Sequence, residues 1–345
     1  MKKQLLLAAF LMGSFITASA QEVTFDFNDY TVDNMGTDMT GTTAGQGGWL
    51  TFGNPGTPAY TWTNAAFQVV ANDAEHVNAL QITGANTASN GAAFLWQTLD
   101  WAGRTAGNDL VRVEFDVYTG AVEAASKNVF QVALYDETAA KILAGFFIDK
   151  TNLSVDGIVF ATPQTGEDDN LLAPLVDGGL TVPANVWIKL VAIYNYADGT
   201  VAFGGFNADG TQLFAPAGFQ GAAAQTAIGE VDFIVANGYA ANTASASVLF
   251  DNLNVEFFGE TAGVDAVTAT KLSVFPNPAS DVINVANVEG LNAIQIVDLN
   301  GRTVKSVNFA GVSEASVNVS DLTAGVYMMN IATEKGTSTQ KIVKK

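Results

Sequence analysis

The chain has 345 residues and no cysteine, and its 34 Asp and Glu outnumber its 15 Lys and Arg. Disulfides and thiol catalysis are therefore excluded, and large apolar cores must stabilise the fold. The charge imbalance lies in residues 21–270, which carry 6 basic against 28 acidic side chains. This argues against nucleic acid and anionic membranes as partners of that part, because phosphate binding relies on Lys and Arg.

The first twenty residues have the three parts of a secretory signal. Lys2 and Lys3 form a positive start, Leu5 to Ile16 an apolar core, and Ala18-Ser19-Ala20 a small-residue cleavage site. The apolar core is too short to span a bilayer as an uninterrupted helix. We therefore expect cleavage of residues 1–20 and a mature chain that starts at Gln21 and has no transmembrane segment.

Alternating apolar and polar residues predict β-strands along most of residues 21–264. Such strands are expected in 22–30, 110–120, 128–137, 144–149 and 247–258. Within 186–214, Asp198-Gly199 and Asp209-Gly210 separate apolar runs, and Asp-Gly pairs favour tight hairpin turns. This stretch therefore predicts three successive antiparallel strands.

Many antiparallel strands, 33 glycines and no helical periodicity predict an all-β fold, a jelly-roll β-sandwich over residues 21–264. The stretch VWIKLVAIYNYADGTVAFGGFNADG resembles the central hairpins of concanavalin-like and laminin-G-like jelly rolls. The opening FDFNDYTVDNMG and the closing VLFDNLNVEF resemble the first and last strands of such domains in exported bacterial proteins.

Residues 265–345 predict a linker and a second all-β module. Pro276 and Pro278 fix the backbone around Asn277, so the chain enters the strand Val282 to Val285 along a defined path. The Asn300-Gly301 pair is typical of a type I′ hairpin. Taken alone, the module is a small immunoglobulin-like β-sandwich.

This module resembles the C-terminal sorting domain of the type IX secretion system of Bacteroidetes. The resemblance rests on KLSVFPNPASDVINV, IQIVDLNGRTV, DLTAGVYMMNI and the basic end TQKIVKK, in that order. It implies recognition by the type IX translocon, then release or attachment at the cell surface, with surface lipopolysaccharide as the anchor for attachment. The residues expected to carry the sorting signal are Pro276, Asn277, Pro278, Gly325, Val326, Tyr327, Lys341, Lys344 and Lys345.

The sequence offers little for catalysis in residues 21–264. Glu114 and Asp116 have the spacing of a glycosidase carboxylate pair, but Thr119 and Gly120 stand where the third carboxylate is needed. The one histidine, His76, has no serine-hydrolase motif and too few companions for a zinc site. Arg104 and Arg112 are the basic residues that a polysaccharide lyase would need, yet no motif links them to His76.

Binding sites are easier to name. Hard oxygen ligands near the first and last strands suggest a structural Ca²⁺ ion, held by Asp26, Asp29, Asp251 and Asn252. Exposed aromatic rings stack on sugars, and the aromatic residues in loop-like or clustered settings are Trp49, Tyr60, Trp62, Trp96 and Trp101. Trp187 starts an apolar strand and is expected in the core.

The sequence thus predicts an exported or cell-surface protein whose first domain binds an extracellular glycan or mediates adhesion without catalysis. The alternatives are a polysaccharide hydrolase or lyase on the same fold, and a structural component of the surface layer.

Overall fold

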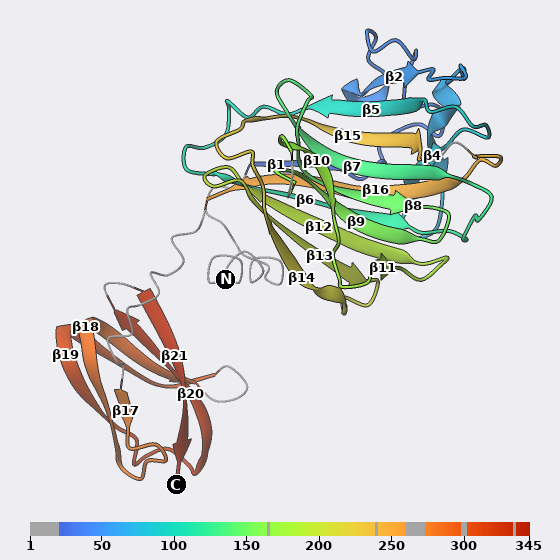
Figure 1. The fold of residues 1–345 in the computed structure, drawn as a ribbon. Helices are drawn as coiled ribbons and strands as arrows, with labels where there is room; N and C mark the ends of the chain where they lie inside the picture. Colours follow the sequence, from blue (N-terminus) through green and yellow to red (C-terminus); the bar gives the residue numbers. More distant parts are fainter. Residues whose placement is uncertain (1–20, 164–165, 239–240, 260–272, 298–301, 334–335) are drawn as a thin grey trace. The chain divides into compact units, whose positions relative to one another are not determined.

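A computed structural model describes residues 21–163, 166–238, 241–259, 273–297, 302–333 and 336–345. The predicted signal peptide, residues 1–20, lies outside the described residues. The chain forms two compact units that divide between positions 260 and 261 (Figure 1). Strands dominate both units and the described residues contain no α-helix, which confirms the all-β prediction. Over that same part of the chain, no helix has the length and apolar character needed to cross a membrane.

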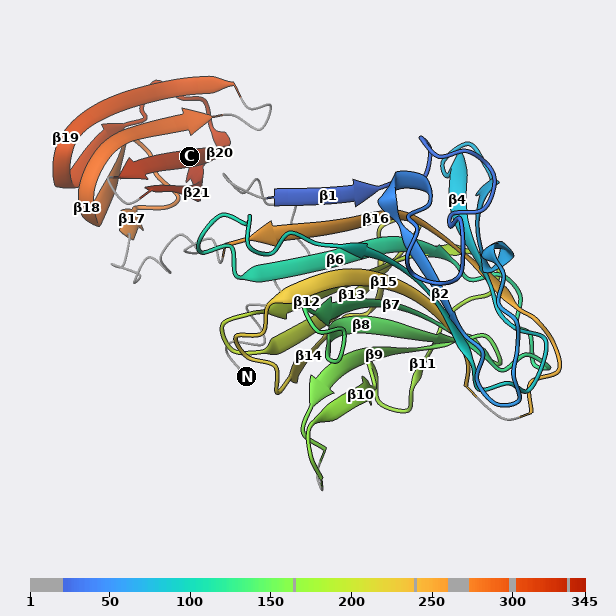
Figure 2. The same cartoon turned by 90° about the horizontal axis from the view of Figure 1, so that it is seen from above.

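The first unit is a sandwich of two eight-stranded antiparallel sheets. Sheet A has the order β14-β13-β12-β6-β16-β4-β3, and β1 pairs with β16 (Figure 2). Its strands are β1 (Gln21–Phe25), β3 (Phe67–Ala71), β4 (Asn78–Thr83), β6 (Leu110–Tyr118), β12 (Trp187–Asn195), β13 (Thr200–Asn207), β14 (Gln212–Gln220) and β16 (Ser247–Phe258).

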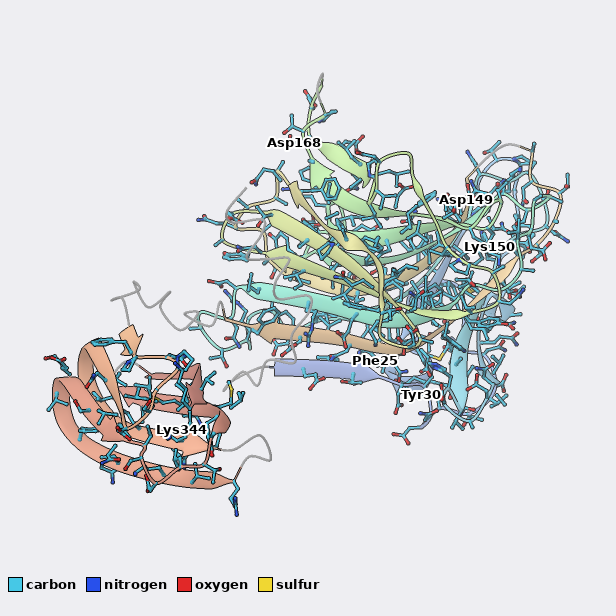
Figure 3. All side chains as sticks on the ribbon, turned by 90° about the horizontal axis from the view of Figure 1, so that it is seen from below. Phe25, Tyr30, Asp149, Lys150, Asp168 and Lys344 are labelled. Atoms are coloured by element: carbon cyan, nitrogen blue, oxygen red, sulfur yellow. The ribbon has the colours of Figure 1, made fainter. Side chains whose placement is uncertain are left out.

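Sheet B has the order β10-β9-β8-β7-β15-β5-β2, and β11 pairs with β9. Its strands are β2 (Leu50–Asn54), β5 (Ala92–Thr98), β7 (Asn128–Asp136), β8 (Ile142–Asp149), β9 (Ser154–Ala161), β10 (Asp169–Ala173), β11 (Leu180–Thr181) and β15 (Ile228–Asn237). Two short 3-10 helices, Gln46–Gly48 and Asn64–Ala66, lie in the connections. The hairpin between β9 and β10, which carries Asp168, extends from the body of the unit (Figure 3).

The two sheets enclose one apolar core built from alternate residues of each strand. Phenylalanines from both sheets meet there: the ring centroids of Phe115 and Phe146 are 5.7 Å apart, and those of Phe233 and Phe250 are 5.1 Å apart. Gly157 of sheet B lies against the Phe203 ring of sheet A, where a Cβ would come within 2.7 Å of it. The remaining alternate residues of each strand therefore point away from the core and form the two outer faces.

The hairpins predicted from Asp-Gly pairs are confirmed. Strands β12, β13 and β14 follow one another in sheet A, and Gly199 and Gly210 adopt φ values of 73° and 78° in the turns. The first strand is shorter than its alternation predicts. β1 ends at Phe25, because Phe27 turns into the left-handed region with φ of 55° and inserts its side chain into the core.

A buried lysine fixes one end of the sandwich. Lys150 follows β8, beside Asp149 (Figure 3), and is 1% exposed. Its Nζ donates hydrogen bonds of 2.6 Å to the carbonyl oxygens of Thr119 and Ala121. Burial lowers the pKa of Lys150, and the charge of Glu123 opposes that change. The ammonium group therefore satisfies backbone carbonyls of the loop that follows β6.

The second unit is a small five-stranded antiparallel sheet with its own apolar core. Its order is β17-β18-β20-β21, and β19 pairs with β18. The strands are β17 (Ser273–Phe275), β18 (Val282–Val297), β19 (Thr303–Asn318), β20 (Gly325–Thr333) and β21 (Gly336–Lys344). β18 and β19 pair as a long antiparallel hairpin, as predicted, although Asn300 and Gly301 lie outside the described residues.

Candidate functional site: the outer face of sheet B

Three of the predicted sugar-binding aromatic residues lie in the core: Trp49, Trp62 and Trp101. Trp49 is fully buried, with its ring centroid 4.9 Å from that of Phe25 and 5.7 Å from that of Phe233. Trp101 is 7% exposed and lies beneath the guanidinium of Arg104, whose Cζ is 3.6 Å from the ring centroid. The expectation that these rings are exposed is wrong, because the glycine-rich segments around them fold back onto the sandwich.

Tyr60 and Trp62 pack against one another rather than forming an open platform. Their centroids are 4.9 Å apart in an edge-to-face arrangement. Trp62 is 8% exposed, its Nε1 donates to the Asn54 carbonyl at 2.9 Å, and its side chain covers Gly53 of β2. Of the five predicted aromatic residues, Trp96 is the one that lies on an outer face, because its neighbour Leu95 takes the inward position of β5.

The predicted calcium ligands have other partners in the structure. Asp251 Oδ2 lies 2.8 Å from His76 Nδ1, and the Asn252 amide donates to Asp116 Oδ2 at 2.7 Å. Asp26 Oδ1 accepts from the Asn28 amide in the turn after β1, and Asp29 is exposed. No group of three His, Asp or Glu side chains among the described residues is placed to hold a metal ion. The structure therefore gives the predicted calcium site no support.

The outer face of sheet A is a set of ion pairs, which we call the paired face. It consists of Arg112, Glu114, Asp116, Lys189 and Glu256. Arg112 Nη2 lies 2.5 Å from Glu256 Oε2, and Lys189 Nζ lies 3.0 Å from Asp116 Oδ1 and 4.0 Å from Glu114 Oε1. Every carboxylate of this face thus has a cation beside it, so Glu114 and Asp116 carry the charges of a structural network.

His76 joins the edge of the paired face. A turn at Asp73, whose Oδ1 accepts from the His76 amide at 2.8 Å, presents the imidazole to Asp251. The ring also stacks on Trp187 at 3.7 Å between centroids. Trp187 is therefore not in the core as predicted: Ile188 takes the inward position at the start of β12, and Trp187 faces outward. Burial raises the pKa of Asp251, and its hydrogen bond with His76 opposes that rise.

The outer face of sheet B differs in composition, and we call it the acidic face. The cross-strand register places its half-buried aromatic and acidic side chains on neighbouring strands. Phe52 of β2 faces Phe94 of β5, with centroids 6.2 Å apart, and Trp96 faces Asp232 of β15. Further members along the sheet are Glu230 on β15, Tyr135 and Gln131 on β7, Phe147 on β8 and Asp156 on β9.

Among the described residues, no Lys or Arg forms a salt bridge with a carboxylate of the acidic face. Asp232 is 4% exposed, and its Oδ1 has no hydrogen-bond partner among the described residues. Burial, followed by the charge of Glu230, raises the pKa of Asp232 well above its usual range. Burial and the charge of Asp136 raise the pKa of Glu230. Burial also raises the pKa of Tyr135, with the charges of Asp232 and Glu230 adding to the rise.

This arrangement can hold a polar ligand that also has apolar surface. Aromatic rings offer stacking area, and a neutral or ionised carboxyl beside them accepts hydrogen bonds. Glu230 and Asp232 lie two apart on β15, the same spacing as Glu114 and Asp116 on β6. The sequence analysis missed the second pair, although the alternation of GEVDFIVAN contains the signal that would have found it.

In the second unit, the predicted sorting residues converge on its last strand. Asn277 Oδ1 accepts from the Val343 amide at 2.9 Å, and Ala279, just after Pro278, exchanges backbone hydrogen bonds with Val343 and Lys345. Residues Gly325 to Tyr327 begin β20, which pairs with β21 through Gly325–Lys344 and Met328–Lys341. The Pro276–Pro278 segment and the basic end of the chain therefore form one structural element.

Comparisons with known proteins agree with this division. Residues 273–345 match the family described as a secretion system C-terminal sorting domain. No curated protein matches the chain. Among solved structures, the chain is similar to the CBM2 module of the evolved Dit of Lactobacillus casei BL23 phage J-1, with 15% identity, a TM-score of 0.44 and coverage of 71% of this chain and 98% of that chain. It is also similar to alginate lyase vAL-1 from Chlorella virus, with 9% identity, a TM-score of 0.43 and coverage of 66% of this chain and 99% of that chain.

The second unit is thus a type IX sorting domain, and its implied partner is the secretion machinery. The protein is accordingly secreted or attached at the outer-membrane surface, as the sequence predicted.

Proposed function

We propose that residues 21–264 are a glycan-binding cargo domain, of the concanavalin-like or laminin-G-like kind, and that the acidic face is its binding site. The observation that carries the proposal is Trp96 beside Asp232 on neighbouring strands, one an outward ring and the other a buried carboxyl with an unused oxygen.

The aromatic residues supply the stacking half of such a site. Sugar rings present flat faces of C–H groups, which pack on half-buried aromatic rings. Phe52 is 40% exposed and adjoins Phe94, and Trp96 is on the same strand as Phe94, two residues along. These rings come from the adjacent strands β2 and β5, so a glycan chain lying across the strands meets more than one of them.

The carboxylates supply the polar half. A buried acceptor without a partner is unfavourable by about 1–3 kcal/mol, and a ligand hydroxyl that displaces the side chains over Asp232 Oδ1 and donates to it would remove that cost. Glu230 lies on the same face and accepts further donors. A glycan offers several hydroxyl donors at the spacing of one sugar ring, which suits two carboxyl groups on one strand.

A glycan array probed with the full chain tests this proposal. We expect retention on at least one polysaccharide, a loss of at least roughly tenfold in affinity for Trp96→Ala, and no change for Trp187→Ala on the outer side of sheet A. Equal losses in both variants would place binding elsewhere. Silence on every glycan would favour a structural role in the surface layer.

A second candidate, a polysaccharide hydrolase, is favoured by the Glu230 and Asp232 pair. A carboxyl with a raised pKa beside a second carboxylate is the pairing that glycoside hydrolysis uses. Release of reducing ends by the parent chain, lost in both Glu230→Gln and Asp232→Asn, would establish an enzyme. Retention without released fragments would leave a binding module or adhesin.

For the tail, the proposed contacts with the translocon are Pro276, Asn277, Pro278, Gly325, Val326, Tyr327, Lys341, Lys344 and Lys345. Asn277→Ala removes the acceptor for the Val343 amide, so we expect the variant to be retained inside cells. Lys305→Ala, on an exposed pair with Asp321, is the matched control and should be exported normally. Attachment of the cargo to lipopolysaccharide stays a prediction.

A further inference from the structure

The outward positions of sheet B have a one-sided charge. Across β5, β7, β8, β9 and β15, the residues that alternate with the core positions include Asp156, Glu230 and Asp232, and none of these described outward positions is Lys or Arg. Lys141, just before β8, places its Nζ 5.1 Å from the Phe160 ring centroid, toward the β9 side of the sheet.

Burial of these carboxyls without a neighbouring cation raises their pKa. Desolvation is the largest cause of the raised pKa of Asp156, Glu230 and Asp232 alike. Each of these carboxyls therefore lies where a negative charge is poorly stabilised. The ionised carboxyls of this face would repel a negatively charged group of a ligand. That group would also lose its hydration without gaining a cationic partner on the face.

The polar groups at the centre of the face favour hydrogen-bond donors. Asp232 Oδ1 has no partner, and Tyr135 and Glu230 lie near enough for their charges to affect one another. Ligand hydroxyls that donate to these oxygens satisfy them, whereas the carboxylates or sulfates of an acidic glycan can only accept. Discrimination between neutral and acidic glycans therefore comes from repulsion by the carboxyls as much as from hydrogen bonds with ligand hydroxyls.

From these observations, and resting on the proposed glycan-binding function, we infer that the acidic face selects uncharged glycans and rejects acidic ones. The ligand class is a neutral polysaccharide whose hydroxyls donate to Asp232 and Glu230 and whose rings stack on Trp96 and Phe94.

Affinity measurements on the full chain test this inference. The probes are soluble β-1,4-glucan, β-1,3-glucan and β-1,4-mannan oligosaccharides against alginate, polygalacturonate and heparin oligosaccharides, at low and high salt. We expect a neutral probe to bind at least roughly a hundredfold more tightly than every acidic probe at low salt, with the gap narrowing at high salt.

Substitutions connect the selectivity to the acidic face. The double variant Glu230→Gln, Asp232→Asn should weaken the neutral probe and strengthen the acidic probes. The double variant Glu114→Gln, Asp116→Asn makes the same change of charge on the paired face. It should leave the ratio of the affinities for the neutral and acidic probes unchanged.

The outcomes separate this inference from the function beneath it. Tight binding of an acidic probe that is lost with Trp96→Ala would overturn the selectivity and leave the glycan site standing. Binding of any probe that is indifferent to Trp96→Ala would overturn both, as would the absence of binding by every neutral and acidic probe.

Discussion

The two outer faces of the sandwich carry the same short pattern with opposite results. Glu114 and Asp116 on β6 have Arg112 and Lys189 beside them. On β15, the cross-strand neighbours of Glu230 are Thr98 and Tyr135, and those of Asp232 are Trp96 and Ala133. On the paired face the charges are neutralised within the protein. On the acidic face no cation among the described residues forms a salt bridge with them. The comparison teaches that the surroundings of a carboxylate pair decide what it does: Arg112 lies two positions earlier on the same strand, and Lys189 lies opposite Asp116 on the neighbouring strand.

The largest effect is expected where the paired face reaches the core. His76→Ala removes the partner of Asp251, which is 1% exposed, and should lower the free energy of unfolding by about 3 kcal/mol. All five tryptophans belong to the first unit, so their fluorescence in a urea titration reports that unit alone. Asp251→Asn, which removes the charge and keeps a polar side chain, should cost less. A loss below about 0.5 kcal/mol for His76→Ala would show that the contact is incidental.

The acidic face should respond in the opposite direction. The native pKa of Asp232 is above that of the unfolded chain, so the native state holds the proton over the interval between them, and stability falls as pH rises through it. Asp232→Asn should therefore stabilise the protein above that interval, by about 1.4 kcal/mol per unit of pKa difference, and change nothing below the usual Asp range. Unfolding midpoints measured from acid to neutral pH check this. A destabilised variant at neutral pH would contradict it.

Lys189→Met makes the paired face resemble the acidic one. Removing the ammonium between Glu114 and Asp116 should lower the free energy of unfolding by about 1 kcal/mol at low salt. Because the interaction is half-exposed and screened, the loss should shrink at high salt. A loss that is independent of salt would mean that the lysine stem, and not its charge, stabilises the face.

The smallest effect is a shift of the Trp96 ring. Gly41 has φ of 77°, and a Cβ there would lie 3.0 Å from Trp96 Cη2, whereas Gly178 has φ of 87° and open space around it. Both Gly→Ala variants carry the backbone strain, but Gly41→Ala alone displaces the ring, so it alone should weaken glycan binding, by roughly two- to tenfold. Equal affinities in the two variants would contradict a role for the ring position.

Local sequence was enough for the strands and for part of the sites. Alternation located β6, and the Asp-Gly turns located the hairpins between β12, β13 and β14, because both signals depend on adjacent residues. The position of Trp96 on an outer face follows from the same alternation, although its partner Asp232 is on a strand more than a hundred residues later. The pairing of such distant strands has no local signal.

The errors have the same origin. Trp49 and Trp62 lie in segments rich in glycine and proline, which resemble exposed loops, yet Gly53 and its neighbours let the chain fold closely over the core. The sequence around Asp251 suggests a calcium ligand, but the turn at Asp73 places His76 against its carboxylate. In each case a contact between segments far apart in the sequence decided the outcome.

The hydrogen bond from the Val343 amide to Asn277 links the first part of the sorting domain to β21, its last strand. A polypeptide that stops before residue 336 lacks that strand. Asn277 and Ala279 then lose their hydrogen bonds with Val343 and Lys345. Ribosomes reach β21 only after the entire cargo has been made. If export depends on the folded sorting domain, translation products that end before β21 lack a complete sorting domain and are not exported.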